Sequence, residues 1–268
     1  MRINIPHPKP SQFVSNETVE QISTEYSRAF REKCPIQEGE LLNIDRLVDF
    51  LEIPMLEEEE DEQTLAVAES EPGQEPIIIV NKRYRNFFRE RPDVYAAAVG
   101  HEIGHIALGH LDLLTPSSEQ SSFQFDVASR PPIRLHKNTW GWYGLSKKEI
   151  EDLKKREHEA IAKVLKASNI DNNVVRALKE RGSHMEPDWM FWQAECFARC
   201  LLIRADLLKV ALQQDWNFHA WAGIYDLARM FGVSGTLMTT RLKKIGVIEI
   251  ENGQPRPCTQ HHQVSLFD

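Results

Sequence analysis

The stretch that is most informative about the fold is residues 92–110, which read PDVYAAAVGHEIGHIALGH. Pro92 and Asp93 indicate a helix start, and the alanine and valine residues that follow are typical of a helix interior. The apolar character continues beyond the charged residues, so we expect a helix that is buried on most sides. Buried charged groups need partners or a metal ion, and this helix carries His101, Glu102 and His105.

The five residues from His101 to His105 have the HExxH spacing of a metal site. Side chains four residues apart lie on one helix face, where His101 and His105 could bind one ion. Glu102 would lie beside that ion and could take a proton from a bound water. Zn²⁺ held by two histidines and one further side chain lowers the pKa of such a water toward ~7 and polarises a carbonyl. The pattern therefore predicts metal-assisted peptide hydrolysis, with Glu102 as general base.

The third protein ligand has to come from elsewhere in the chain. The residue six positions after His105 is leucine, so a third histidine at that spacing is excluded. His110 falls on a different helical face from His105, which indicates a structural or supporting role. Glu195 is the only acidic residue in the otherwise apolar stretch 191–202, and it is our candidate third ligand. The alternative is a simple ion pair between Glu195 and Arg199, one helical turn away.

Taken together, several blocks of this sequence resemble the ImmA/IrrE family of metallopeptidases. The similarity spans about residues 17–250 and is poor across 112–185. The matching blocks are residues 44–48, 77–81, 101–105, 192–203, 225–234 and 241–246.

The resemblance implies a cytoplasmic, zinc-dependent endopeptidase with a zincin-like core. Several known members cut helix-turn-helix transcriptional repressors in stress responses or mobile elements, so the implied partner is a DNA-binding repressor. His101 and His105 would be zinc ligands and Glu102 the general base. The chain departs from the family pattern at Phe191, where the family has its third ligand, a glutamate. Arg204 replaces the family's proline.

The predicted fold class is α+β: a mainly helical zincin-like core with a small sheet, plus a C-terminal helix-turn-helix-like segment. Residues 1–16 are rich in proline and read as an N-terminal arm. The metallopeptidase domain is expected over 17–214, with an insertion at 112–185. The helix-turn-helix-like segment follows at 215–250, and 251–268 reads as a flexible tail.

Local patterns predict four elements in the first third of the chain: helices at 19–34 and 44–51, and strands at 65–68 and 77–80. Residues 71–76 between the two strands are expected to form a hairpin or a loop. An edge strand near the metal commonly aligns an extended substrate in zincins, and residues 77–81 are our candidate. An ordinary core strand is an equally good interpretation of the same residues.

Composition limits the possible functions. The 268 residues are 41% hydrophobic, enough for a sizeable core. The net charge is −8, with a solvated acidic run at 57–62, which argues against broad nucleic-acid binding. The four cysteines form no CxxC pair, and the N-terminus lacks an apolar leader, so we expect a cytoplasmic protein with reduced thiols. Cys196 and Cys200 are expected to be small core residues.

Two alternatives to a peptidase remain open on sequence grounds. Phe191 at the ligand position motivates a peptidase-like regulator that binds its partner without cutting it. Residues 222–246 could instead bind DNA through Arg241 and Lys243, although basic residues fall late in the second helix. Direct nucleic-acid binding is therefore the least favoured reading, and no membrane partner is expected.

Overall fold

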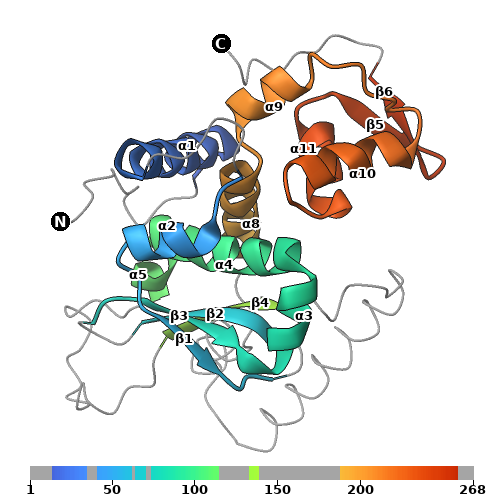
Figure 1. Cartoon of the computed structure of the whole chain (residues 1–268). Helices are drawn as coiled ribbons and strands as arrows, with labels where there is room; N and C mark the ends of the chain where they lie inside the picture. The colour runs from blue at the N-terminus through green and yellow to red at the C-terminus, as the bar shows by residue number, and fades with distance from the viewer. Residues whose placement is uncertain are drawn as a thin grey trace, which may run out of the picture.

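The computed structural model describes residues 14–34, 41–61, 64–70, 74–114, 133–138 and 188–258. Over these residues the protein is mixed α+β, mainly helical with a small sheet, as the sequence predicts. The long insertion and the N-terminal arm lie largely outside the described residues. Figure 1 shows a helical layer above a four-stranded sheet, with a second helical unit beside it.

The larger sheet contains β1 (Met55–Glu58), β2 (Thr64–Ser70), β3 (Ile77–Asn81) and β4 (Ile133–Asn138), in the order β1-β3-β2-β4. β2 and β3, the two predicted strands, form an antiparallel hairpin, with Val67 opposite Ile79. β1 pairs with β3 in parallel, and β4 pairs antiparallel with β2.

This strand order corrects one expectation. Residues 77–81 are not an edge strand, because β3 has a neighbour on each side and its backbone groups are used in the sheet. The edges of the described sheet are β1 and β4. β1 ends inside the acidic run at 57–62, and β4 comes from the insertion at 112–185.

The helices of the first unit cover one face of the sheet (Figure 1). The predicted HExxH helix is confirmed as α4, and α8 packs across it on the side away from the sheet. The close approach is possible because Gly104 faces Ala194, with no side chain between the two backbones. The bounds of these helices are α1 Asn16–Lys33, α2 Ile44–Phe50, 3-10 helix η1 Lys82–Tyr84, α3 Arg85–Glu90, α4 Pro92–Ala107, α5 His110–Leu114 and α8 Asp188–Leu202.

A second apolar core begins at Ile203, which is earlier than the predicted domain boundary at 215. It is formed by α9 (Ala205–Ala211), α10 (Trp221–Met230), α11 (Gly235–Lys244) and the hairpin strands β5 (Ile248–Glu251) and β6 (Gln254–Pro257). The boundary shifts because Leu208 and Ala211 of α9 pack with the C-terminal helices.

The predicted flexible tail is also corrected, because its first residues are ordered. β5 and β6 pair antiparallel around a turn at Asn252 and Gly253, both of which have positive φ. The short polar pair at the tip is typical of a tight hairpin turn. Residues 259–268 lie outside the described part of the chain.

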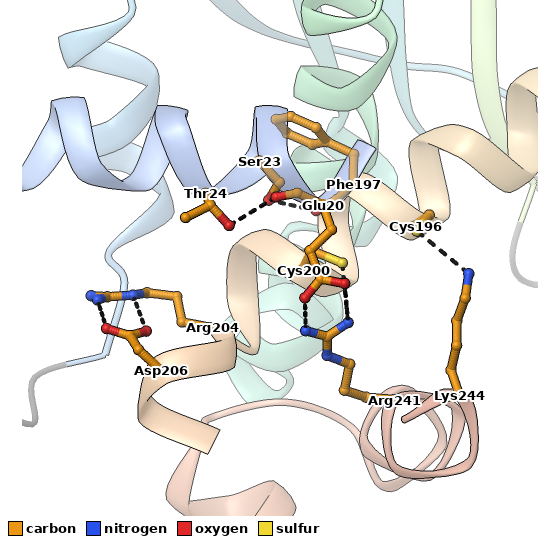
Figure 2. Close-up of polar contacts among 10 residues, drawn as sticks. All are labelled: Glu20, Ser23, Thr24, Cys196, Phe197, Cys200, Arg204, Asp206, Arg241 and Lys244. Carbon is orange, nitrogen blue, oxygen red and sulfur yellow. Dashed lines mark hydrogen bonds and ion pairs between the residues drawn. The ribbon is translucent and has the colours of Figure 1, made fainter. Parts of the chain in front are cut away.

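The two units meet through α11, which faces α1 and α8 (Figure 2). Arg241 of α11 is buried and makes a two-pronged ion pair with Glu20 of α1. Its Nη1 also donates to the Cys200 sulfur at 3.4 Å, while Lys244 Nζ lies 3.8 Å from the sulfur of Cys196. A guanidinium gripping a carboxylate with two nitrogens fixes orientation as well as distance.

Within the described ranges, none of the helices has the length and apolar character needed to cross a membrane.

Candidate metal centre

The two histidines of the HExxH run face each other on α4. His101 Nε2 and His105 Nε2 lie 3.0 Å apart, and both side chains are fully buried. The four-residue spacing on a regular helix produces this geometry, because it places the rings one turn apart on one face. The ring centroids lie 4.7 Å apart, with the ring planes inclined at 71°.

The outer ring nitrogen of His105 is held by His110. The two Nδ1 atoms lie 2.8 Å apart. The sequence-based expectation that His110 lies on a different helical face is wrong, because α4 ends at Ala107 and the chain reverses at Gly109. Gly109 has φ +66°, a conformation that favours glycine, and this turn swings His110 back onto His105. The predicted supporting role of His110 fits this position.

His110 is in turn held by Gln193 from α8. His110 Nε2 lies 3.1 Å from Gln193 Oε1, and Gln193 Nε2 donates to the Val14 carbonyl at 2.8 Å. His110 and Gln193 are both buried, so water does not compete for these bonds. Gln193 is a site residue that sequence reasoning missed. Its only local signal was a polar side chain within an apolar helix.

Glu195 also reaches the histidine pair, but at a different atom from the one predicted. Its Oε1 lies 3.6 Å from His101 Nδ1, the ring nitrogen opposite the one that faces His105. A carboxylate at this place orients a ligating histidine and raises its basicity. The geometry therefore favours a supporting role for Glu195, and its role as third ligand stays a prediction without a contact to carry it.

Phe191 takes the place next to the pair. Its ring centroid lies 5.0 Å from that of His101, with the planes inclined at 54°. The neighbouring Trp192 is 65% exposed and packs edge-on against Phe191. An aromatic side chain thus lies directly against His101.

Glu102 is fully buried on α4, between the two histidines in sequence. Its burial matters because a carboxylate in a site with little water interacts more strongly with a neighbouring cation than it would in solvent.

The spacing of the two Nε2 atoms fits a zinc ion. Zinc bonds to imidazole nitrogens are ~2.0–2.1 Å long, and tetrahedral ligands then lie about 3.3 Å apart. The observed 3.0 Å between the two Nε2 atoms is close to this value. The pair therefore fits two positions of a zinc site. Across the described ranges, however, three or more His, Cys, Asp or Glu side chains are not gathered into one metal-binding group.

The two cysteines of α8 lie on the side of the helix that faces α11 (Figure 2). Both are buried, which confirms the expected core role. A hydrogen bond with Cys200 lowers the pKa of the Cys196 thiol to about 6, and the positive charges of Arg199 and Lys244 act in the same direction. The same hydrogen bond, together with burial, raises the pKa of Cys200.

Comparison of the chain with protein-family models finds no matching family, and comparison with curated proteins finds no match.

Proposed function

We propose that this chain is a zinc-dependent endopeptidase whose metal is held by His101 and His105. The observation that carries the proposal is the pair of buried Nε2 atoms, 3.0 Å apart on one helix face. Nδ1 of His105 lies at hydrogen-bond distance from His110, and Nδ1 of His101 lies 3.6 Å from the Glu195 carboxylate. Zincins bind their metal through such a pair, with the outer nitrogens fixed by supporting groups.

The chemistry follows from the residues around the pair. A bound zinc ion would polarise the scissile carbonyl and make water a better nucleophile at neutral pH. The Glu102 carboxylate takes the proton of the attacking water and delivers it to the leaving amine. Glu195 and His110 keep the rings of His101 and His105 oriented during the reaction.

The sheet offers a place for an extended peptide. β4 is an edge of the described sheet, and α4 contacts it. A substrate strand added there would gain backbone hydrogen bonds next to the metal pair, a role that β3 cannot fill because both its edges are paired. We therefore transfer the substrate-aligning role from residues 77–81 to β4.

The proposed substrate is a regulatory protein, in particular a helix-turn-helix transcriptional repressor. Support for this choice comes from the resemblance of the blocks at 101–105 and 192–203 to the ImmA/IrrE family. A peptidase that cuts one partner needs recognition beyond the cut site, and the exposed Trp192 beside the pair is available for such a contact.

The direct test compares the zinc-loaded wild-type chain with Glu102→Gln, using candidate repressors and extended peptides as substrates. Glu102→Gln should keep its zinc and lose hydrolysis by about 10²- to 10⁴-fold, because only proton transfer is removed. Undiminished cleavage by this variant would rule out the proposed mechanism.

The second candidate function is a peptidase-like regulator that binds its partner without cutting it. The observation that favours it is the Phe191 ring against His101, in place of a carboxylate ligand. Phe191→Glu separates the two readings. If the wild type is a regulator that lacks catalysis because Phe191 replaces a ligand, Phe191→Glu should bind zinc more tightly. The variant should also cleave a peptide that the wild type does not cleave.

DNA binding through α11 receives no support from the geometry. Arg241, one of the two residues suggested for it, is only 1% exposed and is paired with Glu20. A side chain engaged in this way is not presented to a phosphate or a base edge.

A further inference from the structure

A single chain of hydrogen bonds leads from the backbone of Val14 to Nδ1 of His105, the ring nitrogen that does not face His101. It passes through Gln193 on α8 and His110 at the start of α5, and then reaches Nδ1 of His105. Every side chain in it is buried, with exposed fractions of 3% for Gln193, 1% for His110 and 0% for His105. The donors and acceptors are therefore set by one another rather than by solvent.

When His110 and His105 are both neutral, the direction of every bond follows from the first one. A backbone carbonyl can only accept, so the Gln193 amide nitrogen points at Val14 and its oxygen points at His110. The oxygen needs a donor, so His110 carries its proton on Nε2. A neutral imidazole has one N–H, and His110 Nδ1 is therefore an acceptor. His105 must donate from Nδ1, which leaves the lone pair of its Nε2 directed at His101.

We propose that Gln193 is a positioning residue that, through His110, holds His105 in the tautomer able to bind a metal. The inference rests on the proposed zinc site for its function, but the tautomer itself is a property of the metal-free chain. In the opposite tautomer a hydrogen on Nε2 would block the metal position. The hydrogen-bond chain from Val14 through Gln193 and His110 to His105, called the relay below, disfavours this Nε2-protonated tautomer before the ion binds.

The same relay ties the metal pair to the start of α1. Val14 precedes the helix cap Ser15 and belongs to the first apolar core. α1 is fixed to α8 by packing and by the hydrogen bond from Ser23 to the Phe197 carbonyl. The packing of Val14 and α1 against α8 therefore helps to hold His105 in the tautomer that can bind a metal.

The first test measures the tautomer of His105 in the metal-free chain by long-range ¹H–¹⁵N correlation of labelled histidines. The wild type should show an unprotonated Nε2 in His105, assigned with His105→Ala. Gln193→Met keeps the length of the side chain but removes the strong acceptor for His110. This variant should give a mixture of tautomers and bind zinc about 10- to 100-fold more weakly in chelator competition, the range for lost supporting contacts.

A rescue experiment separates the relay from a general packing role. His110→Asn puts an amide oxygen at the place of Nδ1, so it can accept from His105 without help from Gln193. In this background Gln193→Met should no longer change the His105 tautomer or the zinc affinity. If the loss caused by Gln193→Met is the same in both backgrounds, Gln193 acts through packing or through Val14, and the relay is overturned.

Different results would refute the proposed zinc site and the hydrogen-bond relay. A chain that shows the predicted tautomer and its loss in Gln193→Met, yet binds no zinc, would refute the proposed function and leave the relay standing. A chain that binds zinc and cleaves peptides, but has a His105 tautomer indifferent to Gln193→Met, would refute the relay alone.

Discussion

Asn81 holds the end of β3 with a single buried amide. Its oxygen accepts from the backbone nitrogens of Glu60 and Arg83, and its nitrogen donates to the carbonyls of Asp61 and Thr64. The amide thereby ties the loop after β1, the start of β2 and the end of β3 together.

Asn81→Ala should therefore lower the free energy of unfolding by about 3 kcal/mol, because it removes four hydrogen bonds of a fully buried amide, one of them to the buried Thr64 carbonyl. Asn43→Ala is the matched control, since exposed Asn43 caps α2 with one bond to the Arg46 nitrogen and should cost about 1 kcal/mol. The measurement is urea unfolding of the three proteins. Equal losses in the two variants would show that the buried network contributes nothing beyond an ordinary cap.

The candidate site could be predicted from sequence only where local spacing determines geometry. His101 and His105 share a helix face in any regular helix, and the structure shows them facing each other. The contact between His110 and Gln193 could not be predicted in this way. It depends on the turn at Gly109 and on how α8 crosses α4. The atom of His101 that Glu195 meets is likewise set by helix packing, which spacing along α8 does not reveal.

At the scale of elements, two glycines of α4, one turn apart, face α8 at different distances. A Cβ at Gly104 would lie 3.0 Å from the Ala194 Cα and 3.1 Å from its carbonyl oxygen. A Cβ at Gly100 would meet the Ala198 Cβ at 3.4 Å, an ordinary contact. The same substitution should therefore have opposite effects at the two positions.

Gly104→Ala should destabilise the protein by about 1–3 kcal/mol by forcing the helices apart. Gly100→Ala should be neutral or stabilise it by up to about 1 kcal/mol, because alanine loses less backbone entropy in a helix. Thermal unfolding of both variants checks the prediction. A Gly104→Ala protein as stable as Gly100→Ala would contradict the close packing of α4 on α8.

The sheet shows which elements sequence can and cannot reveal. β2 and β3 have runs of apolar and β-branched residues, and both were predicted as strands. β1 contains Glu57 and Glu58, so its composition indicates a loop, and only its parallel pairing with β3 makes it a strand. β4 pairs with β2 across a long stretch of chain, and such a long-range partner leaves no local periodic signal.

At the scale of the whole molecule, Arg241 joins the C-terminal unit to the first. Arg241→Met should lower the free energy of unfolding by about 3 kcal/mol, since it leaves Glu20 partly buried and without its cation. Lys243→Met, an exposed change on the same helix, should stay within about 0.5 kcal/mol of wild type.

Calorimetry checks this prediction, because loss of the ion pair should also separate the unfolding of the two apolar cores. Combining Arg241→Met with Glu20→Met should recover much of the loss, as both charges are then removed. No recovery in the double variant would mean that Arg241 stabilises the interface by packing alone.

The most direct test of the central claim is the zinc content of the purified full-length chain, measured by elemental analysis beside His105→Ala and Glu195→Gln. We predict an equimolar amount of zinc in the wild type, its loss in His105→Ala, and retention with weaker affinity in Glu195→Gln, since Glu195 contacts the outer nitrogen of His101. A wild-type chain that takes up no zinc when it is supplied, or zinc that persists in His105→Ala, would contradict the account.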